Sequence, residues 1–176
     1  MAFPGGQTRA AVVVDSYPDL VAVESVVADL PTTFPYVPGL LSFREAPAIV
    51  AACRSVATTP DLIVVDGQGI AHPRGLGIAS HIGLILDLPT IGCAKSLLVG
   101  RHEPVGDERG SWSPITYGGQ IIGAALRTKT GVKPVYVSIG HRIGFEATIH
   151  WVLELSRGYR LPEPQRQAHV AAGSAS

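Results

Sequence analysis

Residues 61–67 have the sequence DLIVVDG, a short apolar run that ends in a carboxylate and a glycine. Such a run is typical of a strand that is buried in a parallel sheet and delivers a polar side chain at its carboxyl end. Residues 75–87 then place apolar side chains at helical spacing, and residues 89–95 form a second apolar run that ends in Lys95. The order strand, helix, strand predicts an α/β fold with Asp66 and Lys95 at one edge of the sheet.

The flanking sequence predicts further strands and helices around this unit. Two Val-rich segments, residues 10–14 and 20–27, are joined by a turn at residues 17–19 and predict a hairpin. The Pro-rich residues 32–41 favour an extended loop, and a helix is expected over residues 42–56. Beyond the central unit we expect, in order, strands over residues 120–127 and 133–139, a helix over residues 145–157 and a disordered tail over residues 167–176.

Composition indicates one packed domain, which we expect over residues 1–166. The chain has 176 residues, of which 46% are hydrophobic and 16% charged. It contains neither an apolar run of about 18 residues nor an N-terminal leader pattern, so we expect a cytoplasmic protein that does not enter a membrane. Cys53 and Cys93 lack C-x-x-C spacing, which favours buried thiols over a disulfide or a zinc site.

The charges are unevenly distributed although the formal net charge is zero. Residues 1–88 contain 4 basic and 8 acidic residues, whereas residues 89–176 contain 10 basic and 6 acidic residues. A zero total argues against nucleic-acid binding, because phosphate contacts come from Lys and Arg. The asymmetry nevertheless gives one half that could hold a cation and one half that could hold an anion.

Several polar residues at the ends of apolar segments have two interpretations each. Asp66, followed by glycines, either forms a turn or pairs with a divalent cation. Lys95, expected beside Asp66 if the two strands are neighbours, either forms a structural salt bridge or supplies a positive charge to the site. His141, next to Arg142, is more often a structural histidine than a catalytic one.

Two residues near the predicted first helix also have two interpretations each, and the residues alone favour the structural one. Tyr36 lies between Pro35 and Pro38, where it is either an ordinary core tyrosine or a rigid exposed tip suited to wedging between bases. Glu45 either caps its own helix in a capping box with Ser42 or supplies a carboxylate to the site.

Taken in order, five segments resemble the endonuclease V family. They are PYVPGLLSFRE at 35–45, DGQGIAHPRGLGIASHIG at 66–83, IGCAKS at 91–96, GHR at 140–142 and GYRLPEP at 158–164. The resemblance implies a ribonuclease H-like fold, with a mixed sheet flanked by helices. It also implies an endonuclease that uses Mg²⁺, or Mn²⁺ as a substitute, and acts in nucleic-acid repair. The bond cut would be the second phosphodiester 3′ to deoxyinosine in DNA, with inosine in RNA as an open alternative.

The resemblance also assigns roles to individual residues. Glu45 and Asp66 match metal-binding carboxylates, and Lys95 and His141 match residues near the scissile phosphate, which gives four catalytic candidates. Tyr36 matches the wedge that separates strands beside the lesion. The full set implied to bind substrate is Tyr36, Pro35, Pro38, Gly39, Leu41, Gly67, His72 and Gly92.

The sequence departs from the family pattern at its start. Family members begin with a strand that carries an Asp shortly before a Phe or Tyr, and in that register Met1-Ala2-Phe3 falls just after the Asp. Asp15, at the far end of the next strand, cannot take that role. We therefore expect the first, central strand of the sheet to be absent, and cleavage by the 176-residue form to be severely reduced.

Two other functions compete with this interpretation. One is an inosine- or mismatch-binding protein that does not cut. The other is a metal-dependent hydrolase of small phosphate esters, which would use Asp66, Glu45 and His141 but leave Tyr36 without a role. We expect the protein to be a monomer.

Overall fold

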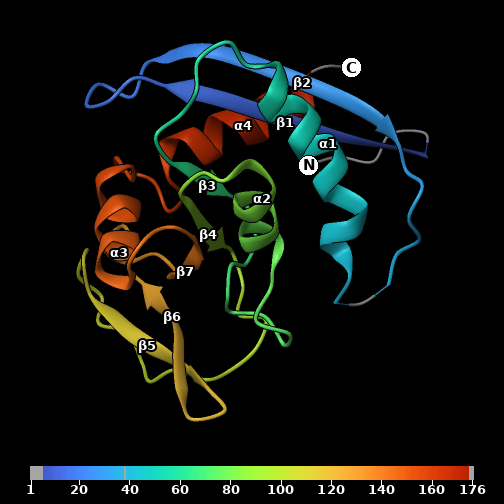
Figure 1. The fold of residues 1–176 in the computed structure, drawn as a ribbon. Helices are drawn as coiled ribbons and strands as arrows, with labels where there is room; N and C mark the ends of the chain where they lie inside the picture. Colours follow the sequence, from blue (N-terminus) through green and yellow to red (C-terminus); the bar gives the residue numbers. More distant parts are fainter. Residues whose placement is uncertain (1–5, 38, 175–176) are drawn as a thin grey trace. The chain divides into compact units, whose positions relative to one another are not determined.

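The structure of the protein, a computed structural model, describes residues 6–37 and 39–174. The chain forms two compact units (Figure 1). Unit 1 comprises Met1–Asp61 with Pro164–Ser176, and unit 2 comprises Leu62–Glu163. The expectation of one domain over residues 1–166 stays a prediction.

Unit 1 is built on the predicted hairpin, which the structure confirms. Strands β1 (Gln7–Asp15) and β2 (Ala22–Pro31) pair antiparallel and are longer than the Val-rich segments alone indicate. Helix α1 (Leu41–Ser55) packs on them through small side chains, with Ala48 and Ala52 against Ala10. Because these side chains are short, the helix axis can lie close to the sheet.

The start of α1 excludes one of the two interpretations of Glu45. The helix begins at Leu41, and Leu40 at its N-cap position makes no side-chain capping bond. Ser42 therefore lies inside the first turn and is not the cap of a capping box, so that explanation of Glu45 is wrong. The Glu45 side chain is buried, with the residue 8% exposed.

Helix α4 (Glu163–Ser174) occupies most of the region predicted to be a disordered tail, so that prediction is wrong over the described residues. Ala is the strongest helix former, and the small residues that suggested disorder are compatible with a helix. Glu163 and Pro164 fit the first turn, where an acidic side chain is favourable and the missing N–H of proline costs little. No helix within residues 6–37 and 39–174 is long and apolar enough to cross a membrane.

Unit 2 contains a five-stranded mixed sheet in the order β3-β4-β7-β6-β5. The strands are β3 (Ile63–Val65), β4 (Thr90–Ala94), β5 (Trp112–Tyr117), β6 (Gln120–Leu126) and β7 (Val135–His141). β3 and β4 are parallel, and the other three pairs are antiparallel. No strand was predicted over Trp112–Tyr117, and this strand contains Pro114. β5 forms an edge of the sheet, where proline is tolerated.

Helices α2 (Ile78–Leu86) and α3 (Phe145–Glu154) cover opposite faces of this sheet (Figure 1). Large apolar side chains fill the α3 face, where Ile91 and Cys93 pack with Val152. The α2 face is lined instead by small residues. There the Thr90 hydroxyl donates to the Ala79 carbonyl of α2 at 2.8 Å, and the Gly69 N–H donates to the Ser138 hydroxyl at 2.9 Å. The loop after β3 therefore lies directly on the sheet.

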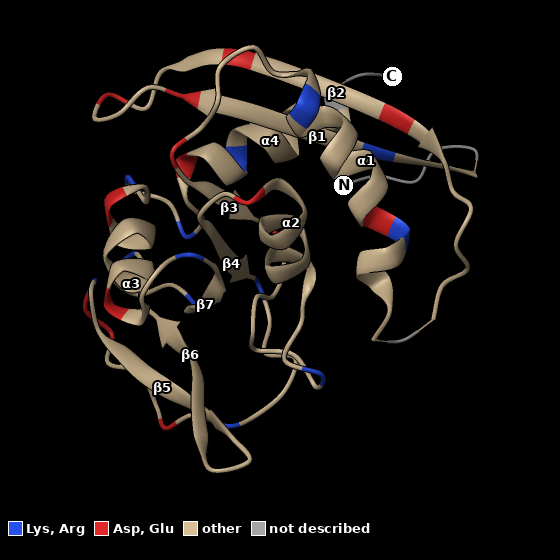
Figure 2. Cartoon of the chain, viewed as in Figure 1, with Lys and Arg blue, Asp and Glu red and all other residues tan. Residues whose placement is uncertain are grey.

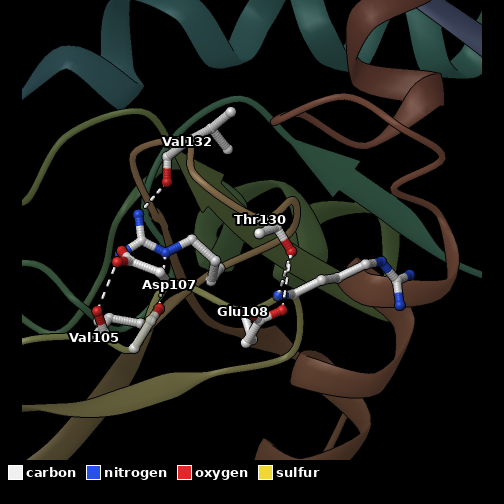
Figure 3. Close-up of polar contacts among 8 residues, drawn as sticks. Val105, Asp107, Glu108, Thr130 and Val132 are labelled. Atoms are coloured by element: carbon white, nitrogen blue, oxygen red, sulfur yellow. Dashed lines mark hydrogen bonds and ion pairs between the residues drawn. The ribbon is translucent and has the colours of Figure 1, made fainter.

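Arg127, at the end of β6, holds the long connection between β4 and β5. Its guanidinium donates to the carbonyl of Val105 at 3.0 Å, to that of Gly106 at 2.9 Å and to that of Val132, and it pairs with Asp107 (Figure 3). Only 11% of the side chain is exposed. A planar fork of donors suits such a cluster of carbonyls, so Arg127 is a structural anchor of this loop.

The space around Gly92 shows how closely the loop after β3 packs on β4. A Cβ at residue 92 would lie 2.3 Å from the Gly69 nitrogen and 2.8 Å from the Gly67 carbonyl oxygen, both of which are backbone atoms. We expect Gly92→Ala to lower the free energy of unfolding by about 2 to 3 kcal/mol, because backbone must move to accept the methyl group. Urea unfolding monitored by circular dichroism measures the change.

Gly173→Ala is the matched control for that substitution. Gly173 lies in α4 with no atom within 4 Å of the added Cβ. Alanine is preferred to glycine in a helix, so this variant should be unchanged or slightly more stable. Equal stability of Gly92→Ala and the wild-type chain would contradict the close packing of residues 67–69 on β4.

Candidate active site

Asp66 and Lys95 lie side by side at the carboxyl ends of β3 and β4. Val65 is paired with Gly92 in the parallel ladder, Asp66 follows Val65 directly, and Lys95 follows Ala94. The Lys95 ammonium donates to Asp66 Oδ2 at 2.7 Å. The predicted proximity of the two side chains is therefore confirmed, and it results from the parallel pairing of their strands.

This ion pair is open to solvent. The side chains of Lys95 and Asp66 are 41% and 37% exposed. Exposed pairs of this kind contribute about 0 to 1 kcal/mol to stability, so stability is a weak reason for their presence. A ligand phosphate or a cation could reach both groups.

Charged residues of unit 2 lie near the ends of strands, in loops and on α3, whereas β3, β4 and β7 contain no Asp, Glu, Lys or Arg (Figure 2). The Asp66–Lys95 pair therefore borders an apolar interior. Cys93 lies beneath it, fully buried, and burial raises the pKa of its thiol to about 12. That thiol stays protonated at neutral pH and is a poor nucleophile.

The loop after Asp66 contains two of the predicted site residues, Gly67 and His72, and a third, Gly92, lies in β4. A Cβ at Gly67 would lie 2.5 Å from the Ile78 side chain, and Gly92 lies under the loop backbone. Packing thus explains why both positions are glycine, and the role of these glycines in a base pocket stays a prediction. His72 accepts a hydrogen bond at Nδ1 from the Arg74 N–H at 3.2 Å. Burial, and then the charge of Arg74, lower the pKa of His72. Because Nδ1 accepts a hydrogen bond, the neutral ring carries its proton on Nε2.

His141 lies at the other end of the sheet from the ion pair. β7 runs antiparallel to β4, so His141, at the carboxyl end of β7, is paired with Thr90 at the amino end of β4. The structure therefore does not bring His141 together with Asp66 and Lys95. Sequence reasoning missed this because it depends on the direction of β7, which the local pattern does not specify.

The polar partners of His141 also lie away from the ion pair. His141 Nε2 lies 3.3 Å from Asp87 Oδ1, and Arg142 donates to Asp87 Oδ2 at 2.8 Å. These two contacts, first the hydrogen bond with His141 and then the charge of Arg142, hold the pKa of the Asp87 carboxyl below its usual value. The cluster links the end of α2 to the end of β7, and the catalytic role of His141 stays a prediction.

Unit 1 has an exposed apolar tip before α1. Tyr36 is 68% exposed, and Pro35 beside it is also exposed. Leu41 is 41% exposed, and Gly39 has a φ of +76°, which favours glycine. The core-tyrosine interpretation is therefore wrong, and the predicted exposed tip is confirmed. Pro38 lies outside the described residues.

The described carboxylates form no complete set of protein ligands for a divalent cation. Within residues 6–37 and 39–174, no group of three or more His, Cys, Asp or Glu side chains is placed to hold a metal ion. Mg²⁺ commonly takes one or two carboxylates and completes its octahedron with waters and substrate phosphates. The exposed carboxylate of Asp66 fits that mode of binding.

Two residues at this site were not singled out from the sequence. Gln68 donates to the Ser96 carbonyl at 3.0 Å, and Arg160 donates to the Lys95 carbonyl at 2.6 Å. Both lie in segments that resemble the family, DGQG and GYRLPEP, which was the available signal. Their contacts depend on the folded loops and could not be inferred from spacing.

Comparison with known proteins identifies the family. The endonuclease V family model matches residues 2–170. The endonuclease V of Trichormus variabilis is 57% identical over 170 residues, which cover 97% of this chain and 77% of that protein.

Solved structures agree with this match. The endonuclease V of Streptomyces avermitilis has a TM-score of 0.87 at 40% identity, covering 97% of this chain and 81% of that one. The human protein has a TM-score of 0.91 at 33% identity, covering 99% and 80%. The endonuclease V of Ciona intestinalis, 24% identical with a TM-score of 0.82, shares the fold and was solved with DNA containing an inosine. The chain thus has a ribonuclease H-like fold and is a nuclease that belongs to the endonuclease V family.

Proposed function

We propose that this chain is a metal-dependent endonuclease that cuts the second phosphodiester bond 3′ to deoxyinosine in DNA. The observation that supports the proposal best is the solvent-exposed pair of Asp66 and Lys95 at the carboxyl edge of β3 and β4. This edge is where ligands bind in open α/β sheets. The family-like segments around both residues and the inosine-containing DNA bound by the Ciona relative support the choice of substrate.

In this proposal Asp66 and Glu45 supply carboxylate oxygens to Mg²⁺, for which Mn²⁺ can substitute. When bound, the ion lowers the pKa of an attacking water and offsets charge on the phosphate oxygens. Asp66 offers an exposed carboxylate on a strand end, whereas Glu45 is buried on α1. The assignment of Glu45 rests on the resemblance of residues 35–45 to the family.

Lys95 contributes the positive charge at the reacting phosphate. Its ammonium, paired with Asp66 in the absence of substrate, can turn to a phosphate oxygen without leaving the end of β4. A fixed cation that faces the charge developing in the transition state lowers the barrier. His72, neutral with its proton on Nε2, can donate a hydrogen bond from the same loop as Asp66.

Tyr36 is assigned to the strand-separating wedge. Its ring is exposed at a turn in which the Leu40 N–H donates to the Val37 carbonyl at 2.9 Å. An aromatic ring can replace part of the stacking that an extruded base loses. Gly39 and Leu41 flank it in the same exposed segment.

Substitution of the ion pair tests the proposal. Asp66→Asn and Lys95→Met should each lower single-turnover cleavage of a duplex with one deoxyinosine by about 100-fold, because each removes charge from the reacting centre. Asp61→Asn is the matched control, since Asp61 is an exposed carboxylate just before the same strand. Removal of Mg²⁺ with a chelator should abolish cleavage, and Mn²⁺ should restore it.

Gel-shift measurements with and without Mg²⁺ complete that test. Full cleavage by Asp66→Asn would refute the assignment of the site. Mg²⁺-independent binding of the inosine duplex with no cleavage at any metal concentration would instead support the non-cutting inosine binder.

Tyr36→Ala tests the wedge. Loss of the ring should weaken cleavage of an inosine-containing duplex by about 10-fold and affect a single-stranded inosine oligonucleotide much less, because only the duplex must be opened. Tyr117→Ala, which removes a 47% exposed tyrosine on β5, is the control. An equal loss on both substrates would contradict the wedge. Efficient hydrolysis of bis(p-nitrophenyl) phosphate, unaffected by Tyr36→Ala, would favour the small-ester hydrolase.

A further inference from the structure

The backbone at the base of Lys95 is held from two directions. The β3–β4 ladder ends at Gly92 and the β4–β7 ladder ends at Ala94, so the carbonyls of Lys95 and Ser96 lie beyond both ladders. Arg160 Nη2 donates to the Lys95 carbonyl at 2.6 Å, and Gln68 Nε2 donates to the Ser96 carbonyl at 3.0 Å. Two consecutive carbonyls are thus satisfied by side chains that come from different loops.

Arg160 also ties this segment to the neighbouring strand. Its guanidinium donates to the Pro134 carbonyl at 2.8 Å and to the Lys133 carbonyl at 3.0 Å, just before β7. The guanidinium of Arg160 therefore joins the end of β4 to the two residues that precede β7. The rigid geometry of guanidinium suits several carbonyls at once, which a single ammonium does not reproduce.

Gln68 has a feature that stability alone does not explain. Its Oε1 is buried and has no hydrogen-bond partner within the described part of the chain. A buried acceptor without a partner is destabilising, and a methionine of similar length would avoid that cost. The contribution of Gln68 is then the one hydrogen bond that it donates, to the carbonyl after Lys95.

We propose that Arg160 and Gln68 are positioning residues, which fix the backbone at Lys95 so that its ammonium stays directed at Asp66. An exposed lysine has many rotamers, and an ion pair in water is too weak to select one of them. Anchoring the backbone at both carbonyls removes the motion at the root of the side chain. We call these hydrogen bonds of Arg160 and Gln68 to the backbone at Lys95 and Ser96 the brace. What Lys95 then does to a phosphate rests on the proposed function, but the brace itself does not.

The rate of trace acetylation of Lys95 reports how well the brace holds the ion pair, and it requires no cleavage assay. The chain has three lysines, and exposed Lys129 serves as the internal reference for Lys95. Asp66→Asn removes the partner and sets the upper limit of the Lys95 rate. Arg160→Lys and Gln68→Met, neither of which changes the net charge, should raise the Lys95 rate relative to Lys129 by about two- to fivefold. Peptide mass spectrometry gives both rates from one digest.

Arg127→Lys is the matched control. Arg127 also donates to several carbonyls, but to those of Val105, Gly106 and Val132 rather than to Lys95 (Figure 3). The Arg127→Lys variant should have a lower free energy of unfolding, but its rate of Lys95 acetylation relative to Lys129 should be unchanged. A rise as large as that of Arg160→Lys would mean that general loosening explains the effect and would overturn the proposal.

The remaining outcomes are also decisive. An unchanged Lys95 rate in both Arg160→Lys and Gln68→Met, with a raised rate in Asp66→Asn, would show that the ion pair needs no brace. In cleavage assays, the two brace variants should lower the single-turnover rate and leave the Kd for inosine-containing duplex unchanged. If Lys95→Met has no effect on cleavage, the proposed role of Lys95 fails while the acetylation result still decides the brace.

Discussion

The parallel pairing of β3 with β4 is the constraint on which the candidate site depends. It places Val65 opposite Gly92, and the two strands then end in adjacent polar residues, Asp66 and Lys95. A shift of the ladder by one residue would turn each side chain to the other face of the sheet. The apolar sequence of both strands, with charge only at their ends, makes such a shift unfavourable.

The small residues on one face of the sheet also help to position the candidate site. Gly92 and Ser138 allow the loop after Asp66 to lie directly on β4 and β7, where Ser138 accepts the Gly69 N–H. This contact fixes the loop that begins at Asp66. The opposite face, filled by Ile91, Cys93 and residues of α3, provides the apolar core. One face thus contributes stability, and the other holds the site.

The sequence predicted the parts that depend on local pattern. The hairpin, the strand–helix–strand unit and the contact between Asp66 and Lys95 all followed from hydrophobic spacing and the ends of apolar runs. It failed where the result depends on sheet position or strand direction. Pro114 is tolerated because β5 is an edge strand, and His141 lies far along β4 from Lys95 because β7 is antiparallel.

The ends of helices were the other source of error. Ser42 and Glu45 matched a capping box, but α1 begins one residue earlier and Glu45 is buried. The Ala-rich C-terminal residues suggested a tail, yet they form α4. Helix boundaries depend on packing as well as on capping residues, and composition alone does not report packing.

The most direct test of the central claim locates the bound cation relative to the strand ends. In a ¹⁵N-labelled chain bound to a deoxyinosine duplex, substoichiometric Mn²⁺ broadens the amide signals nearest to it. The account predicts the strongest broadening at Asp66, Gly67 and Lys95, with His141 and Asp87 affected much less. Strongest broadening at His141 and Asp87 would place the cation at the other end of the sheet and contradict the account.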